Sequence, residues 1–454
     1  MKGMTIANIA RACGGEYYGS RDLLETEISS VVTDSRKASP GCLFAAIVGE
    51  RVDGHDFIAS AAESGAICCL CEKRPEKAGL PAIVVDSTPE ALKRLVAFYR
   101  SQFNIPIIGV TGSVGKTTAK EMIASVLAQK YSVLKTQGNF NNELGVPLTL
   151  FELREEHQVA VVEMGISTFG EMRRLTQIVR PDMAVFTVIG YAHLEFLHDR
   201  QGVLRAKAEI LEGMPPDGVV FTNGDDDMLR SLECAQKKIS FGTVPSCHVR
   251  AEDVQILGLD GMTCIIVSGS RRFTVKIPAF GLHMVSAAAA GAAVGLQMGL
   301  TDEEIAAGIA AYKTVGRRSA VFDTGNITII DDCYNANPSS TASAIRSLAT
   351  MKGRRVCILG DMLELGENSG RFHFDLGVFA AKNGVSLVIT CGPEAENICC
   401  GALEQGCEVR HYYSKEELIS ELPSLIMSGD TVLVKASRGM AFEDIVEALK
   451  KLHN

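Results

Sequence analysis

The chain has 454 residues, of which 46% are hydrophobic and 22% charged, and its formal net charge is −9. This length exceeds what one hydrophobic core usually serves, so we expect roughly two to four domains. No run of about 18 apolar residues occurs, which excludes a transmembrane helix. The N-terminus is too rich in polar residues and glycine for a signal peptide. The acidic balance, without a basic tract, argues against nucleic acid as a partner.

The first segment, residues 1–103, combines short strand and turn patterns. It also holds the densest cysteine group, Cys68, Cys69 and Cys71. No second cysteine or histidine pair follows at the spacing of a zinc site, and most other cysteines lie singly in apolar runs. We therefore expect buried free thiols rather than a structural metal, and a reducing compartment, the cytoplasm.

The second segment, residues 104–314, alternates strand and helix patterns. Continuous apolar runs, typical of a parallel sheet buried on both faces, occur at 107–111, 159–164 and 183–189. Residues 254–277 have an antiparallel pattern, with a hairpin turn at Asp260-Gly261.

The third segment, residues 315–454, restarts the alternation. It predicts a second doubly wound α/β domain, with strands at 327–331, 355–359, 387–390 and 431–435.

The stretch 105–118, IPIIGVTGSVGKTT, reads as a buried strand, a glycine turn, a lysine and two hydroxyl residues, and a helical pattern follows over 119–131. Backbone N–H groups at a helix N-terminus favour an anion. Lys116 is placed to reach the outer phosphates of ATP or GTP, and the Thr117 hydroxyl to bind the accompanying magnesium. The usual first glycine of such a loop is replaced by Val110, so an ordinary strand-to-helix turn is the alternative.

Three further polar residues follow strand or helix patterns in the second segment. Glu163 ends a strand, where ligands of doubly wound sheets gather, so we favour magnesium binding over a helix-capping role. His193 follows the next strand and is either part of this site or a hydrogen-bonded loop histidine. Lys207 lies in a helical pattern, and taken alone it favours a solvated helix face.

Polar residues also gather at two strand ends of the third segment. Asn337 and Pro338 in DDCYNANPSS are typical of a helix N-cap and first turn, so a well-capped helix is the alternative to a ligand site. Lys435, Ser437 and Arg438 follow another strand, where a solvated turn is equally compatible with the pattern.

The motifs VTGSVGKTT, EMG, AHLE, KAE and DDCYNANP, in this order, resemble those of the Mur ligases of peptidoglycan synthesis. TGxxGKT is that family's form of the loop, which accounts for Gly112. The segments TQGNFNNELGVPLTL, LGDMLELG and KASRGM resemble the MurF type, and TDSRKASPGCLFAAIVGERVDGHDF resembles the UDP-substrate domain of the MurE and MurF types. The resemblance covers essentially the whole chain.

The resemblance implies an α/β fold of three domains: a small mixed α/β UDP-substrate domain (1–103), a central ATP-binding domain with a mostly parallel sheet (104–314) and a Rossmann-like dipeptide-binding domain (315–454). It implies ATP-dependent addition of D-alanyl-D-alanine to UDP-N-acetylmuramoyl-tripeptide, through an acyl phosphate and a tetrahedral intermediate. We expect a cytoplasmic monomer that closes about a hinge near residues 312–320.

The resemblance also implies roles for individual residues. The ATP phosphates would be wrapped by Gly112, Ser113, Val114, Gly115, Lys116, Thr117 and Thr118. One magnesium ion would be held by Thr117 and Glu163, and a second by His193 and by Lys207, the lysine that this family carbamylates with carbon dioxide. The third domain would bring Arg317 and Asp332 to the nucleotide. The catalytic set would be Lys116, Lys207, His193, Arg317 and Asp332.

The substrate contacts are implied in the same way. The UDP part would contact Ser35 and Arg36, and the peptidyl part Asn141 and Asn142. The incoming dipeptide would contact Asn335, Lys435, Ser437 and Arg438. At one place the chain departs from the family, because Met284 and Ala287 stand where a family motif usually carries asparagines. The asparagine next to the histidine, here Met284, normally helps to hold adenine, so the adenine contacts of this chain are left open.

Other classes fit less well. A guanine-specific switch usually carries an [NT]KxD motif, and TNGDD lacks the lysine. MurE-type enzymes carry a DNPR-like motif that is absent here, and a folate ligase has no need of the N-terminal domain. A non-catalytic nucleotide-binding relative remains the alternative from another class.

Overall fold

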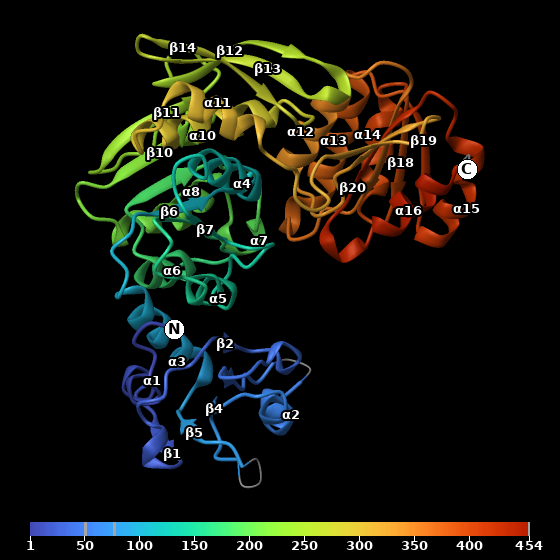
Figure 1. Cartoon of the computed structure of the whole chain (residues 1–454). Helices are drawn as coiled ribbons and strands as arrows, with labels where there is room; N and C mark the ends of the chain where they lie inside the picture. Colours follow the sequence, from blue (N-terminus) through green and yellow to red (C-terminus); the bar gives the residue numbers. More distant parts are fainter. Residues whose placement is uncertain (50–51, 76–78, 453–454) are drawn as a thin grey trace.

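The computed structural model describes residues 1–49, 52–75 and 79–452, arranged in three lobes in chain order (Figure 1). Within these residues the strands form sheets of five, nine and six strands, ordered β1-β5-β4-β3-β2, β14-β13-β12-β11-β10-β9-β6-β8-β7 and β15-β16-β20-β17-β18-β19. The predicted three-part α/β fold is therefore confirmed, while the boundaries proposed at 103 and 314 stay a prediction. Glu50 and Arg51, part of the segment assigned to the UDP-substrate domain, lie outside the described residues.

The first lobe is a small mixed sheet with helices on it. Its strands are β1 (Glu16–Tyr18), β2 (Val31–Val32), β3 (Leu43–Ala45), β4 (Cys68–Cys71) and β5 (Ala82–Val84). Its helices are α1 (Ile6–Cys13), η1 (Arg21–Leu23), η2 (Ser35–Lys37), η3 (Gly54–Phe57), α2 (Ile58–Glu63) and α3 (Thr88–Arg100). The cysteines of β4 are buried free thiols. Helix α3 joins this lobe to the second, because the buried Tyr99 donates a 2.6 Å hydrogen bond to the Leu153 carbonyl.

The second lobe holds the nine-stranded sheet within the described chain. Its strands are β6 (Ile107–Thr111), β7 (Val133–Lys135), β8 (Val159–Glu163), β9 (Met183–Phe186), β10 (Val219–Asn223), β11 (Lys237–Gly242), β12 (Val249–Ile256), β13 (Met262–Ser268) and β14 (Arg271–Ile277). Its helices are α4 (Lys116–Leu127), α5 (Gly145–Phe151), α6 (Glu171–Val179), α7 (Leu194–Leu197), α8 (Arg200–Ala208), η4 (Glu209–Gly213), α9 (Asp227–Arg230), η5 (Gly258–Asp260), α10 (His283–Gln297) and α11 (Asp302–Ala310).

Strands β6 to β12 pair with their neighbours in parallel. Strands β12, β13 and β14 form the predicted antiparallel hairpins, and Gly261 has φ 94° in the first turn. Two predicted ranges were wrong. The helix expected at 119–131 runs from Lys116 to Leu127, because Gly115 takes a positive φ of 83° and starts the helix earlier. The strand expected to reach residue 189 ends at Phe186.

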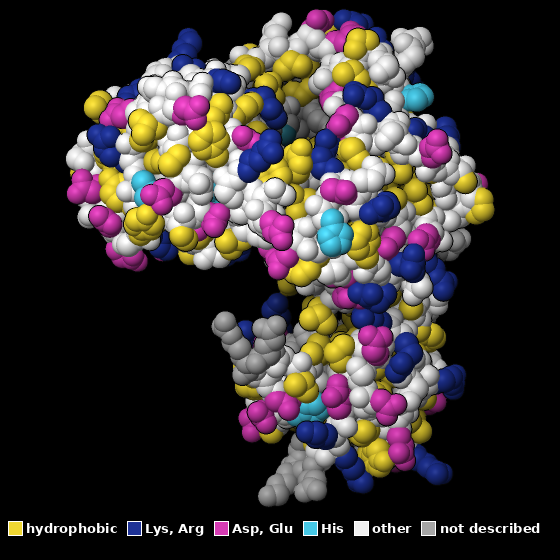
Figure 2. All heavy atoms as spheres, turned by 180° about the vertical axis from the view of Figure 1, so that it is seen from behind, with side chains coloured by type: hydrophobic (Ala, Val, Ile, Leu, Met, Phe, Trp, Pro, Cys, Tyr) yellow, Lys and Arg dark blue, Asp and Glu magenta, His cyan; other side chains and the backbone are white. Residues whose placement is uncertain are grey.

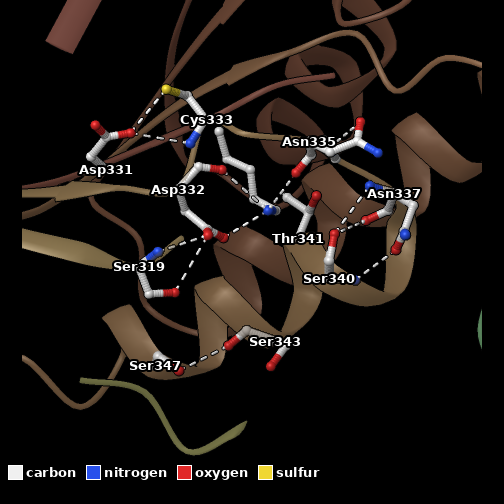
Figure 3. A network of polar contacts seen from close by, with 12 residues as sticks. Ser319, Asp331, Asp332, Cys333, Asn335, Asn337, Ser340, Thr341, Ser343 and Ser347 are labelled. Atoms are coloured by element: carbon white, nitrogen blue, oxygen red, sulfur yellow. Dashed lines mark hydrogen bonds and ion pairs between the residues drawn. The ribbon is translucent and has the colours of Figure 1, made fainter. Parts of the chain in front are cut away.

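The third lobe is the second doubly wound domain that the sequence predicts. Its strands are β15 (Ala320–Asp323), β16 (Thr328–Asp331), β17 (Arg355–Gly360), β18 (Leu387–Cys391), β19 (Glu408–Tyr412) and β20 (Thr431–Lys435). Its helices are α12 (Pro338–Leu348), η6 (Gly366–Asn368), α13 (Ser369–Lys382), α14 (Glu396–Glu404), α15 (Lys415–Leu425), η7 (Arg438–Met440) and α16 (Glu443–Lys451). Asn337 caps α12 and Pro338 lies in its first turn, which confirms that prediction (Figure 3).

The first and third lobes extend from the second in different directions (Figure 1). Ring contact between Tyr191 of the second lobe and Phe372 of α13, with centroids 4.9 Å apart, helps to hold the second and third lobes together. No helix of the described chain has the length and apolar character needed to cross a membrane.

Candidate active site

A cavity of about 400 Å³ lies between the second and third lobes. A hollow is visible between these lobes in the space-filling view, with Lys and Arg side chains at its rim (Figure 2). The predicted site residues that line the cavity are Ser113, Val114, Gly115, Lys116, Thr117, Thr118, Asn141, Asn142, Glu163, His193, Asp332, Asn335 and Lys435. The carboxyl ends of β6 and β8 on one lobe, and of β16 and β20 on the other, thus lead to one site.

The phosphate loop joins β6 to α4 and has no room for side chains at its first glycine. Gly112 has φ 147°, and a Cβ added there would lie 2.0 Å from the Thr187 hydroxyl oxygen. That hydroxyl donates a 2.6 Å hydrogen bond to the Val114 carbonyl, which fixes the middle of the loop. Lys116 begins α4, and its Nζ donates to the Gly112 carbonyl over 2.8 Å. Residues 113–118 line the cavity at the N-terminus of α4, a position that favours an anion.

Thr117 and Glu163 bring a hydroxyl and a carboxylate together at the base of the loop. The Thr117 hydroxyl donates to Glu163 Oε2 over 2.8 Å, and the Asn141 amide donates to Glu163 Oε1 over 2.8 Å. Hydroxyl and carboxylate oxygens suit a hard divalent cation, and magnesium commonly takes one or two carboxylates together with substrate phosphates. The donor set therefore fits magnesium, and magnesium binding by Glu163 stays a prediction.

The second group of polar residues consists of His193, in the turn before α7, and Lys207, on α8. His193 Nδ1 is 2.6 Å from Glu364 Oε2 of the third lobe, and burial holds the pKa of His193 below its ordinary value although Glu364 opposes this shift. Lys207 is 1% exposed, so the solvated-face interpretation was wrong. Burial and, to a smaller degree, the Lys116 cation hold the pKa of Lys207 well below its ordinary value. Within the described residues, no hydrogen bond or ion pair engages its amine.

On the third lobe, Asp332 and Lys435 are tied to each other. Lys435 Nζ donates to Asp332 Oδ2 over 2.6 Å, to the Asn335 carbonyl over 2.8 Å and to the Asp332 carbonyl over 3.3 Å. These contacts use all the N–H donors of an ammonium group. Asp332 Oδ1 also accepts from the Ser319 N–H over 2.9 Å (Figure 3). Lys435 is 3% exposed, so a solvated turn does not describe it.

The structure places Arg317, the arginine predicted at the nucleotide, in ion pairs on the third lobe, and its role at the nucleotide stays a prediction. Arg317 does not belong to the described lining of the cavity, whereas Arg318 does. Arg317 instead pairs with the buried Asp331 over 2.8 Å and with Glu447 of α16 over 3.2 Å. The two side chains diverge in the bend before β15, where Arg317 pairs with Asp331 and Arg318 lies over the Tyr334 ring.

This difference predicts unequal effects on stability. We expect Arg317→Met to lower the free energy of unfolding by about 1–3 kcal/mol, since the buried Asp331 carboxylate loses its charged partner. Arg318→Met is the matched control, because no ion pair engages Arg318 in the described chain. Urea unfolding of both variants measures the difference, and equal losses would contradict the assignment.

The remaining predicted substrate residues lie outside the described lining of this cavity. Ser35 and Arg36 lie on η2 in the first lobe, where the exposed Arg36 pairs with Asp34 over 2.8 Å. The ammonium of Lys37, on the same turn, lies 5.8 Å from the ring centroid of Phe140, so this turn faces the loop that carries Asn141. On the third lobe, the Leu363 N–H donates to the Ser437 hydroxyl over 2.9 Å, and Arg438 pairs with Glu443 over 3.3 Å.

Sequence reasoning missed several residues of the site. His283 and Glu171 line the cavity beside Arg318. Burial lowers the pKa of His283, and Glu171 accepts from the Ser167 N–H over 2.9 Å. Lys120 is fully buried one turn beyond the loop, with Nζ 2.6 Å from the Thr136 carbonyl and 4.0 Å from Glu163. Each begins or lies on a helix, where a single polar residue carries no distinctive signal.

The fold and the cavity define a phosphate-loop nucleotide-binding protein whose site is completed by a second α/β lobe. Three family models match the chain: the Mur ligase family catalytic domain over 27–100, the Mur ligase middle domain over 110–295 and the Mur ligase glutamate ligase domain over 316–438. The chain belongs to the Mur ligase family.

The similarity extends over nearly the whole chain. The UDP-N-acetylmuramoyl-tripeptide–D-alanyl-D-alanine ligases of Bacillus subtilis (strain 168) and Escherichia coli (strain K12) are 37% and 35% identical to it, covering 98% and 99% of both chains. A crystal structure of MurF from Acinetobacter baumannii is similar, with a TM-score of 0.90, 33% identity and 98% coverage of each chain. MurF from Thermotoga maritima, solved with ADP, has a TM-score of 0.82 and 30% identity, covering 93% of this chain and 97% of that one. The predicted resemblance to the MurF type is confirmed.

Proposed function

We propose that this protein uses ATP to join D-alanyl-D-alanine to UDP-N-acetylmuramoyl-tripeptide in peptidoglycan precursor synthesis. The observation that carries the proposal is the single cavity into which the phosphate loop of one lobe and the strand ends of another both open. The full-length similarity to ligases of this name supports the choice of substrates. The cytoplasmic location and the monomeric state remain predictions.

The chemistry explains why two lobes are needed. A carboxylate does not form an amide with an amine unaided, so the ATP γ-phosphoryl group is transferred to the acid and gives an acyl phosphate. The amine then attacks the carbonyl carbon, and phosphate leaves through a tetrahedral intermediate. Lys116 at the loop stabilises negative charge on the phosphoryl group. Alignment of three reactants contributes about 7–11 kcal/mol of barrier reduction, and a hinge near residues 312–320 serves this closure.

The donor set supports two magnesium ions. Thr117 and Glu163 would hold the first, 2.8 Å apart as hydroxyl and carboxylate. His193 would contribute to the second together with Lys207, if the latter is carbamylated. Bound magnesium would neutralise charge on the transferring phosphate. The number of ions and the modification are parts of the proposal.

Lys207 is well placed for carbamylation. Its amine nitrogen must be neutral to attack the carbon of carbon dioxide, forming a C–N bond and releasing a proton. Burial and the neighbouring Lys116 disfavour the ammonium form. The resulting carbamate would carry a negative charge beside Lys116, which reverses an unfavourable pair into a favourable one.

The substrate sites follow the placement of the predicted residues. Ser35 and Arg36 would contact the UDP part in the first lobe. The loop facing them would guide the peptidyl chain past Asn141 and Asn142 to the cavity. Asn335, Ser437 and Arg438 would receive the dipeptide from the third lobe. Lys435, whose donors are all engaged, would act here by holding Asp332 and the Asn335 turn.

A phosphate-release assay tests the function. ATP, magnesium and UDP-N-acetylmuramoyl-tripeptide are supplied with D-alanyl-D-alanine, D-alanine, L-lysine or glutamate as the amine. We expect release and amide formation with the dipeptide only. Preference for a single amino acid would indicate a MurE-type reaction, and no ATP consumption with any amine would indicate a non-catalytic relative.

A further inference from the structure

The Arg318 guanidinium lies over an aromatic ring at the cavity. Its central carbon is 3.7 Å from the ring centroid of Tyr334, and both residues line the cavity. A guanidinium stacked on a ring is attracted by the negative face of the π-system and is restricted in orientation. Within the described chain no hydrogen bond or ion pair engages it, so its N–H fork is free for another partner.

The backbone around Arg318 is held to the turn that carries Tyr334. The Tyr334 N–H donates to the Arg317 carbonyl over 3.2 Å, and the Ser319 N–H donates to Asp332 over 2.9 Å. Ser319 has φ 54°, a left-handed conformation that persists where its surroundings fix it. Asp332 is fixed in turn by Lys435. Arg318 is thus bracketed on both sides by bonds to a single turn.

A second cation, Lys116 of the phosphate loop, lines the same cavity from the other lobe. Two cations from different lobes that repel each other across a cavity are favourable only when an anion lies between them. Arg438 is the other cation near this ring, 5.8 Å from its centroid, but its guanidinium is paired with Glu443.

We propose that Tyr334 is a positioning residue: it stacks on Arg318 and holds the guanidinium toward the nucleotide phosphates bound at the loop. This inference rests on the proposed function for the identity of the anion. The hydrogen bonds on either side of Arg318 attach Arg318 and Tyr334 to the third lobe. Arg318 therefore reaches the phosphates only when the third lobe lies against the second.

A double-mutant cycle tests the pair. We expect Arg318→Ala to lower kcat by about 10²–10³-fold, as loss of one fixed donor to developing charge does. Tyr334→Leu lowers kcat about 3- to 30-fold, the range of a cation–π contact, whereas Tyr334→Phe keeps the ring and most of the rate. Because Tyr334 acts through Arg318, the double variant Arg318→Ala/Tyr334→Leu has the rate of Arg318→Ala alone.

The same cycle is measured for ATP–magnesium affinity by calorimetry, which needs no acceptor substrate. Losses that multiply in the double variant would overturn the role of Tyr334, because the ring would then act independently of the arginine. So would a Tyr334→Phe variant as impaired as Tyr334→Leu. If the unmodified enzyme binds ATP but does not ligate the dipeptide, the proposed function fails, and the affinity cycle still decides the inference. Thermal unfolding shows that each variant is folded.

Discussion

Replacing Lys116 by alanine is expected to lower ligation by at least about 10²–10³-fold while the protein stays folded. The lysine begins α4 and faces the cavity, so it is the loop's own charge for the transferring phosphoryl group. Within the described chain, the Lys116 ammonium donates one hydrogen bond, to the Gly112 carbonyl. Removing the Lys116 ammonium also removes its electrostatic repulsion with Lys207 and with Arg318.

Phosphate release and thermal unfolding measure the two halves of this expectation. Lys130→Ala is the matched control, because this exposed lysine lies just beyond α4 and its ammonium donates to the Gly299 carbonyl over 2.8 Å, away from the cavity lining. We expect the control to turn over normally and the two variants to melt within a few degrees of each other. Normal turnover by a folded Lys116→Ala protein would contradict the phosphate-loop assignment.

Those features that depend on a short stretch of chain could be predicted from the sequence. The phosphate loop needs a strand, glycines with room for positive φ, and a helix start, and all of these are contiguous. The Asn337 cap and the Gly261 turn are likewise local. Buried parallel strands such as β20 are apolar runs between turns, so their positions could also be predicted closely.

The side to which a charged residue points could not be predicted in this way. Arg317 and Arg318 are adjacent and chemically identical, and both lie in the bend before β15, so no local pattern tells which one lines the cavity. Buried lysines are the second case. Lys207 and Lys120 lie in helical patterns that suit a solvated face, and their burial arises from packing against distant segments. The shared cavity depends on how the lobes sit, which no motif encodes.

Replacing Lys207 by alanine is expected to lower ligation by about 10²–10³-fold, the loss of several kcal/mol of charge stabilisation near the phosphates. The physical reason is its environment. A buried amine that makes no hydrogen bond or ion pair with the described residues, beside another lysine, is an unfavourable ammonium but a suitable nucleophile for carbon dioxide. If the carbamate of Lys207 supplies the needed negative charge, a small carboxylate that enters the space left by the side chain restores part of the activity.

Formate and acetate are therefore added to Lys207→Ala, and the rate of phosphate release is followed against their concentration. We expect a saturable, partial recovery. Lys207→Met is the matched control, because its side chain fills the same space without a charge, so it loses activity without recovering. Lys116→Ala also stays inactive in these salts, since a carboxylate does not replace a cation. Undiminished activity of Lys207→Ala would remove this lysine from the site, and equal recovery of the methionine variant would show that the anion acts elsewhere.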